Sequence, residues 1–317
     1  MKHQLKITNG EFHSQTRIVA GKLSIPQKNK TGKQTEFRGL GKLKFYLLTL
    51  CLATVLTSGL IANPKGKPKV LVVMSAADTI LLDGVKKHPT GVFLNELYFP
   101  VKMLNEKGFE IVFATPSGRK ATIDPESTKD KYWQSESEKE EAIRLLSNFP
   151  TYEKPISLEQ AMKDNHTFVG ILVPGGQGLM TDLLYDGKVP QLLRSFHEKR
   201  KPIGLVCHAP ALLTSLRSEG EKENFLFKGY KVNSVTKIEE WFIETIVMKG
   251  KPKLRNISGA LQDLGMEYQS SFLPGRSYAI RDRNLITSQN PFSGNEFSEL
   301  YWEAIEDYLQ KNVSLAD

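Results

Sequence analysis

The stretch IGLVCHAPALLTSL, residues 203–216, decides the fold because an apolar strand in it runs straight into a helical pattern. Its first four residues form an unbroken apolar run, as expected of a strand that is covered on both faces. Pro210 is a favourable residue in the first turn of a helix. Cys207 therefore lies at a tight turn from strand to helix, at the carboxyl edge of a sheet, where open α/β sheets bind their ligands.

Apolar strands of the same kind alternate with helical patterns through residues 69–312. The strands include KVLVVMS at 69–75, FEIVFATP at 109–116 and FVGILVPGGQG at 168–178. This alternation predicts one α/β domain with a doubly wound, mostly parallel sheet flanked by helices, a flavodoxin-like sandwich. A polar, charge-dense stretch at about 117–164 is predicted to be a helical insertion.

Three segments of different character precede the first strand. Residues 1–44 form a basic leader, residues 45–62 (FYLLTLCLATVLTSGLIA) an uncharged apolar segment that includes Cys51, and residues 63–68 a linker. A basic flank followed by an apolar stretch is typical of a secretory signal or a short membrane anchor. We therefore expect an exported protein, or one tethered to a membrane through residues 45–62.

The net charge of +8 belongs to the leader. Residues 1–66 contain eleven Lys and Arg against two Asp and Glu, so the remaining residues carry 32 basic against 33 acidic side chains. A body of nearly zero net charge lacks the basic excess that binding to a phosphate backbone requires, and we expect no nucleic-acid partner. No spacing of His, Cys, Asp or Glu suggests a metal cage and no phosphate-binding glycine loop is present, so we expect neither metal nor other cofactor.

Cys207 is the candidate nucleophile. A thiol at the start of a helix lies at the positive end of the helix dipole, which favours the thiolate and lowers the pKa of the thiol. Cys207 is also the only cysteine after Cys51, so residues 69–312 can form no internal disulfide. The alternative interpretation is a structural cysteine buried in an apolar run.

His208 is the last of the six histidines. Papain-like enzymes and genuine glutamine amidotransferases need a histidine well downstream of the cysteine, so both layouts are excluded. A histidine that assists Cys207 is then either His208 itself or one further upstream. The alternative is a histidine with a purely structural role at the turn.

Four further residues are candidates for the same site. The amides of Gly176 and Gln177, in the glycine turn after a neighbouring strand, are placed to face an oxyanion together with the amide of His208. Glu96 lies on the apolar face of the first predicted helix, where burial would raise its pKa and let it carry protons; alternatively, it reaches solvent. Glu240 either orients His208 as the third member of a triad or is an ordinary acid at a helix start.

Five stretches resemble, in this order, the large glyoxalase III branch of the PfpI superfamily, which is class I glutamine amidotransferase-like: TGVFLNEL, LVPGGQG, VCHAPALL, SVTKIEE and LITSQNP. The resemblance covers about residues 69–310, and it departs at Gln177, where many members have histidine. It implies roles for the same six residues: nucleophile (Cys207), neighbouring triad histidine (His208), acidic third member (Glu240), carboxyl that hydrogen-bonds the thiol (Glu96) and oxyanion turn (Gly176, Gln177).

The resemblance implies a glutathione-independent glyoxalase that converts a small reactive carbonyl, methylglyoxal or a related 2-oxoaldehyde, to a 2-hydroxy acid such as D-lactate. It also implies a cytoplasmic setting as the alternative to export, and we expect a homodimer. Four alternatives stay open: a cysteine amidase or peptidase, a protein deglycase of the same superfamily, a holdase chaperone, and a membrane-tethered stress or redox sensor in which Cys207 is oxidised reversibly.

Overall fold

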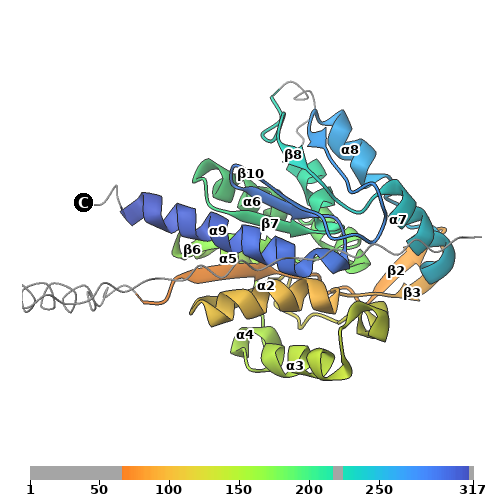
Figure 1. Ribbon diagram of the computed structural model, residues 1–317, viewed down its shortest axis with the longest axis horizontal. Helices are drawn as coiled ribbons and strands as arrows, with labels where there is room; N and C mark the ends of the chain where they lie inside the picture. Colours follow the sequence, from red (N-terminus) through yellow and green to blue (C-terminus); the bar gives the residue numbers. More distant parts are fainter. Residues whose placement is uncertain (1–65, 217–223, 314–317) are drawn as a thin grey trace, which may run out of the picture. The chain divides into compact units, whose positions relative to one another are not determined.

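A seven-stranded sheet forms the centre of the computed structural model, which describes residues 66–216 and 224–313 (Figure 1). Neighbouring strands are parallel except for β10 and β11, which form an antiparallel hairpin at one edge. The predicted doubly wound, mostly parallel sheet is thus confirmed. Across the sheet the order is β10 (Ala279–Asp282), β11 (Leu285–Ser288), β7 (Ile203–Val206), β6 (Phe168–Val173), β1 (Lys69–Val73), β4 (Glu110–Thr115) and β5 (Ile156–Ser157).

Helices cover both faces of this sheet (Figure 1). On one face α2 and α9 contact each other and the strands, and on the other α5 and α6 pack together with the 3₁₀ helix η6 (Ala209–Leu216). The α-helices of the described residues are α2 (Leu94–Glu106), α3 (Glu136–Ser147), α4 (Pro150–Glu153), α5 (Leu158–Lys163), α6 (Lys188–Glu198), α7 (Lys237–Phe242), α8 (Ile257–Asp263) and α9 (Gly294–Val313).

Smaller elements lie at the carboxyl edge of the sheet and within the region 117–164. That region contains α3, α4, α5 and the edge strand β5, so the predicted insertion is helical. The remaining elements are the paired strands β2 (Thr79–Leu82) and β3 (Lys86–Pro89), the paired strands β8 (Lys231–Val232) and β9 (Glu267–Tyr268), the 3₁₀ helices η1 (Pro125–Thr128), η2 (Asp130–Tyr132), η3 (Asn165–Thr167), η4 (Gln177–Met180), η5 (Leu183–Tyr185) and η8 (Pro291–Ser293), and the π-helix η7 (Ile243–Met248).

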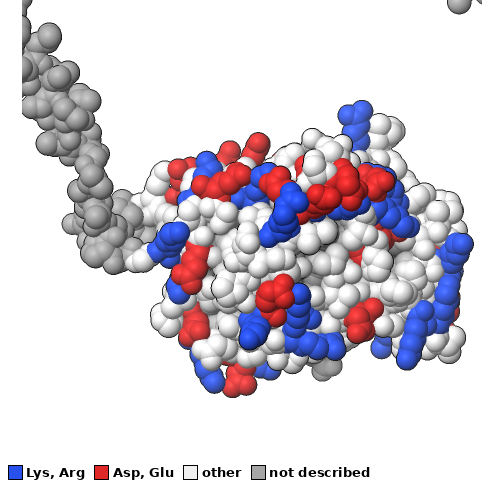
Figure 2. All heavy atoms as spheres, turned by 90° about the horizontal axis from the view of Figure 1, so that it is seen from below, with Lys and Arg blue, Asp and Glu red and all other residues white. Residues whose placement is uncertain are grey.

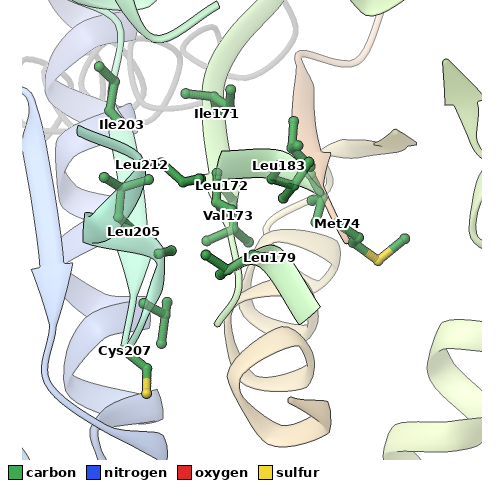
Figure 3. Close-up of a cluster of buried hydrophobic side chains, with 14 of the residues drawn as sticks. Met74, Ile171, Leu172, Val173, Leu179, Leu183, Ile203, Leu205, Cys207 and Leu212 are labelled. Carbon is green, nitrogen blue, oxygen red and sulfur yellow. The ribbon is translucent and has the colours of Figure 1, made fainter. Parts of the chain in front are cut away.

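The apolar runs that predicted the central strands are buried. Leu205 in β7 and Leu172 in β6 are fully covered, as is Leu212 in η6. Figure 3 shows these side chains in one cluster, with Cys207 beyond Leu205 where the strand has ended. The core thus holds the carboxyl ends of β6 and β7 rigidly side by side.

One predicted element differs in kind. The helix expected to begin near Pro210 forms a 3₁₀ helix from Ala209 to Leu216 instead of an α-helix. The chain leaves β7 through a left-handed residue at Cys207, and the amide of Ala211 already bonds to the carbonyl oxygen of His208, an i to i+3 contact. The tight turn therefore sets the 3₁₀ winding at the start of this segment.

The prediction of an exported or membrane-tethered protein is wrong as far as the structure describes the chain. Within residues 66–216 and 224–313, no helix has the length and apolar character needed to cross a membrane. Residues 1–44 and 45–62, on which that prediction rests, lie outside the described residues, as does most of the linker 63–68.

Candidate active site

Cys207 occupies a strained turn at the carboxyl end of β7. Its φ angle of 58° is left-handed, a conformation that few residues other than glycine adopt. Two backbone hydrogen bonds enforce it: the amide of Cys207 donates to Ser288 O at 2.8 Å, and its carbonyl oxygen accepts from the amide of Val235 at 3.1 Å. The neighbouring strand and loop therefore hold the thiol at a fixed point, with only 4% of the residue exposed.

Glu96 is buried beside this thiol, where the sequence predicted it. Gly175 lies against both side chains, because a Cβ atom at that position would lie 2.4 Å from Glu96 Oε2 and 2.9 Å from the Cys207 Cβ. Neither carboxyl oxygen of Glu96 has a hydrogen-bond partner of good geometry among the described residues. The Cys207 thiol and the Gly175 amide nevertheless lie close enough to the carboxyl group to lower its pKa.

Burial controls the protonation of both groups. Desolvation raises the pKa of Glu96 to about 8, outweighing those two contacts. Desolvation, followed by the charge of Glu96, also raises the pKa of the Cys207 thiol well above its usual value. The low thiol pKa expected from a helix dipole is therefore wrong for the free protein, since the sulfur is buried against a carboxyl group and the helix that follows is 3₁₀.

His208 points back at the sulfur. Its Nδ1 lies 3.2 Å from Cys207 Sγ, and its Nε2 lies 2.8 Å from Gln177 Nε2. With the Gln177 amide in this orientation its nitrogen donates to Nε2, which places the ring proton on Nδ1, facing the sulfur. Burial lowers the pKa of the imidazole to about 4, which keeps the ring neutral at pH 7.

The glycine turn after β6 lies against the same sulfur. Gly176 has a φ angle of 108°, and a Cβ there would lie 2.2 Å from Gly91 O, so the turn needs glycine. Gly176, Gln177, Cys207 and His208 line one pocket. Within the described part of the chain, no acceptor is assigned to the amides of Gly176 and Gln177, which leaves them available to an anionic oxygen.

Glu240 does not meet His208. Its carboxylate accepts from the amides of Asn256 at 3.1 Å and Ile257 at 3.4 Å, at the start of α8. Burial raises the pKa of Glu240 to about 7. The structure thus corrects the expected triad contact: Glu240 caps a neighbouring helix, and Gln177 takes the place beside the imidazole.

Glu239, which sequence reasoning passed over, faces the pocket instead. Its Oε2 accepts from the amide and hydroxyl of Thr236, both at 2.9 Å, and its Oε1 accepts from Gly275, Gln289 and Asn290. The spacing of Thr236 and Glu239 is the signature of a capping box, which could have singled out this residue. Glu239 therefore joins α7 to the two loops that border the pocket.

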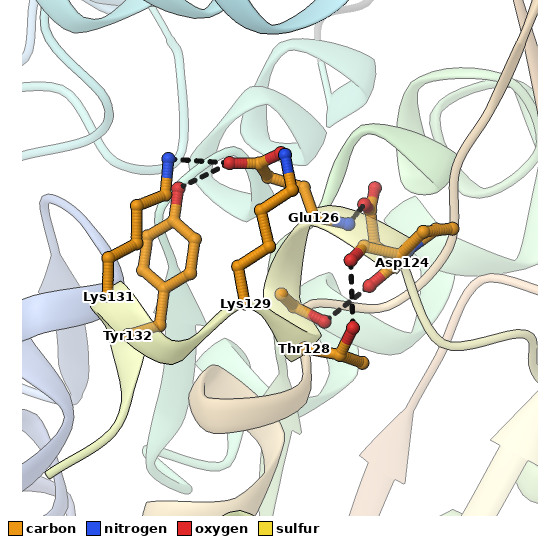
Figure 4. Close-up of polar contacts among 8 residues, drawn as sticks. Asp124, Glu126, Thr128, Lys129, Lys131 and Tyr132 are labelled. Atoms are coloured by element: carbon orange, nitrogen blue, oxygen red, sulfur yellow. Dashed lines mark hydrogen bonds and ion pairs between the residues drawn. The ribbon is translucent and has the colours of Figure 1, made fainter. Parts of the chain in front are cut away.

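The pocket above Cys207 has a volume of about 400 Å³. Polar residues of η1 and η2 form part of its wall. Glu126 makes ion pairs with Lys129 and with Lys131, and accepts from the Tyr132 hydroxyl at 3.2 Å (Figure 4). Asp124 accepts from the Thr90 hydroxyl at 3.1 Å and from the amide of Glu126 at 2.9 Å. Most of these charges are thus neutralised or hydrogen-bonded within the protein.

No set of three His, Cys, Asp or Glu side chains in residues 66–216 and 224–313 converges closely enough to hold a metal ion. The reactive groups that the structure does assemble are the thiol of Cys207, the carboxyl group of Glu96, the imidazole of His208 and the amides of the glycine turn. This arrangement defines an α/β protein whose site is built on a cysteine at a strand-to-helix turn.

Comparison with known proteins places the chain more narrowly. The family model for the DJ-1/PfpI family matches residues 90–304, and the chain belongs to this family. It is 28% identical over 242 residues to the protein/nucleic acid deglycase HchA of Pseudomonas aeruginosa (strain UCBPP-PA14), which covers 74% of this chain and 80% of the relative. HchA of Staphylococcus aureus (strain Newman) is 26% identical over 248 residues, with 75% and 80% covered.

A solved structure shares the fold. The crystal structure of glyoxalase III from Candida albicans superposes with a TM-score of 0.62 at 22% identity, covering 75% of this chain and 97% of the other. At this identity the comparison shows a shared fold, and the family match confirms the resemblance to the PfpI superfamily that the sequence motifs indicated.

Proposed function

We propose that the protein is a glutathione-independent glyoxalase that converts 2-oxoaldehydes to 2-hydroxy acids by cysteine covalent catalysis. The observation that carries this proposal is the pairing of Cys207 with a buried carboxyl group whose pKa is raised to about 8. A carboxyl group with a pKa near the working pH can both give and take a proton. The relatives named deglycases and the glyoxalase III fold support an enzymatic role for this site.

The first step forms a carbon–sulfur bond. The reactive state of the pair has lost one proton, and Glu96 loses it first because the pKa of the Cys207 thiol is raised well above its usual value. The Glu96 carboxylate then takes the thiol proton as the sulfur attacks. The sulfur adds to the aldehyde carbon, and the carbonyl oxygen takes the proton of Glu96 to give a hemithioacetal. The amides of Gly176 and Gln177 stabilise the charge that develops on this oxygen.

The second step moves hydrogen between carbons. The Glu96 carboxylate removes the proton from the carbon bonded to sulfur and delivers it to the adjacent carbon, while the hydroxyl proton passes to the neighbouring oxygen. The product is a 2-hydroxy thioester. Water then attacks the thioester, the carbon–sulfur bond breaks, Glu96 takes a proton from the water and the 2-hydroxy acid leaves. Glu96 suits this task better than His208, whose pKa of about 4 makes it a weak base.

Turnover of methylglyoxal by the full chain, without glutathione, tests the proposal. We expect Cys207→Ala to lower kcat/KM by at least about a thousandfold and Glu96→Gln by about a hundredfold. Glu240→Gln is the matched control, since the same substitution at another buried carboxyl should change kcat/KM by less than about threefold. Lactate formation that survives Cys207→Ala would refute the mechanism.

A deglycase is the second candidate, favoured by the name of the relatives. The same thiol would attack a carbonyl adduct that is still attached to a protein side chain. A peptide carrying a methylglyoxal adduct, followed by mass spectrometry, separates the two: release of the unmodified peptide without turnover of free methylglyoxal supports the deglycase.

The near-zero charge of residues 67–317 keeps our expectation that nucleic acid is not the substrate. We also expect a homodimer, which sedimentation of the full chain tests.

A further inference from the structure

The pocket is larger than a three-carbon substrate requires. A volume of about 400 Å³ lies in the range of sites for drug-sized ligands. The reacting groups occupy only its floor, at Cys207 and the glycine turn. The rest of the pocket must therefore contact either water or a substituent of the substrate.

Apolar side chains of α7 and η7 form one wall of the pocket. Ile238 and Trp241 of α7 line it, as do Ile243 and Val247 of η7. Ile238 is 60% exposed and Trp241 59% exposed, which is unusual for large apolar side chains next to a cavity. The π-helical winding of η7 widens the turn here, and such segments occur frequently at functional sites.

Aromatic rings line the same pocket. Tyr132 contacts Phe93 edge to face with ring centroids 5.0 Å apart, and Phe292 at 5.7 Å. All three belong to the pocket lining. A planar aromatic group would find edge-to-face and stacking partners among them.

The polar groups of the pocket offer little to a charged substituent. Lys131 is already paired with Glu126 at 2.6 Å. The carboxylate of Glu239 is held by five hydrogen bonds and leaves a negative charge near the floor of the pocket. An anionic substrate would be repelled there, whereas an uncharged one would not.

We propose that the substrate is an uncharged 2-oxoaldehyde with a bulky apolar substituent, aryl or long alkyl, whose reacting carbons lie at Cys207 and whose substituent lies against the wall of α7 and η7. This proposal rests on the proposed glyoxalase function and specifies the class of substrate that the enzyme takes. Methylglyoxal leaves the apolar wall uncovered and is the poorer substrate.

The test compares phenylglyoxal with methylglyoxal as substrates of the full chain. We expect kcat/KM for phenylglyoxal to exceed that for methylglyoxal by at least about tenfold, since each added carbon in an apolar pocket contributes to discrimination. Ile238→Ala and Trp241→Ala should each lower this ratio at least about threefold. Ile143→Ala is the matched control, because Ile143 is 51% exposed on α3 and is not part of the pocket lining. A ratio near one, or a ratio that neither wall variant changes, overturns the inference and leaves the glyoxalase proposal intact.

A binding measurement distinguishes failure of this substrate proposal from failure of the proposed glyoxalase function. If neither aldehyde is consumed, the proposed function fails, and the apolar wall is then judged by calorimetry on the Cys207→Ala variant. Binding of the uncharged mandelamide at least about tenfold tighter than that of lactamide supports the wall as the site of an apolar substituent. Equal affinities overturn it.

Discussion

At the residue scale, Glu96 makes the proposed activity depend on pH. The pair of Glu96 and Cys207 becomes reactive when it loses its first proton, and the pKa of the carboxyl group is raised to about 8. We therefore expect kcat/KM to rise from about pH 6 to about pH 9 with an apparent pKa near 8 that belongs to the pair. A pH profile of the initial rate measures this, and a profile that is flat or falls over that range would contradict the assignment.

The same residue affects stability. The Glu96 carboxyl group titrates near 4.5 in the unfolded chain and near 8 in the folded protein, so the folded protein binds this proton more tightly. The contribution of Glu96 to the free energy of unfolding therefore falls as the pH rises from about 4.5 to about 8. Glu96→Gln removes that dependence, and we expect it to raise Tm relative to the unmodified protein more at pH 8 than at pH 5. Thermal unfolding at both pH values checks this; an equal Tm difference would sink the prediction.

At the scale of elements, the turn after β6 controls the contact between the thiol and the carboxyl group. A Cβ on Gly175 would lie 2.4 Å from Glu96 Oε2 and 2.7 Å from Val206 O, and backbone cannot yield to it easily. We expect Gly175→Ala to reduce kcat/KM at least about a hundredfold and to lower stability by about 1–3 kcal/mol. Gly187→Ala, where no atom lies within 4 Å of the added Cβ, is the control. Comparable effects in both variants would argue against a special role for this turn.

Sequence patterns predicted the elements better than the contacts between them. The apolar runs identified β1, β4, β6 and β7, and the apolar face that carries Glu96 identified α2. Burial on both faces of a strand requires an unbroken apolar run, and burial on one face of a helix requires apolar residues at helical spacing. Glu239 and Glu240 are adjacent on α7 and point in different directions, so only the packing of α8 and the loops decides which one reaches the pocket. The raised pKa of Cys207 was equally out of reach, since it follows from burial in the folded protein.

At the scale of the whole molecule, the near-zero net charge of residues 67–317 agrees with the mixture of basic and acidic side chains on the surface of the described residues. On the face seen in Figure 2, Lys and Arg side chains lie among Asp and Glu side chains, in groups separated by uncharged surface. Five of the twelve ion pairs among the described residues lie between two exposed side chains, such as Arg144 with Glu140 on α3, and pairs of this kind contribute little to stability. Such a face gives a polyanion no continuous basic surface, which agrees with the expectation that the substrate is small.

The longest helix of the described residues, α9, offers a test of the fold that is independent of the site. Tyr301 of α9 is buried against the sheet, and glycines in β6 and β7 make room for its ring: a Cβ at Gly170 would lie 2.8 Å from the hydroxyl oxygen, and one at Gly204 would lie 2.9 Å from the ring. The hydroxyl group has no hydrogen-bond partner among the described residues. Because an unsatisfied buried hydroxyl is costly, we expect Tyr301→Phe to increase the free energy of unfolding by about 1 kcal/mol, without a change in kcat/KM. Gly204→Ala should instead lose about 1–3 kcal/mol by overpacking the same interface. Urea unfolding measures both, and a loss of stability in Tyr301→Phe would mean that the hydroxyl group has a stabilising partner.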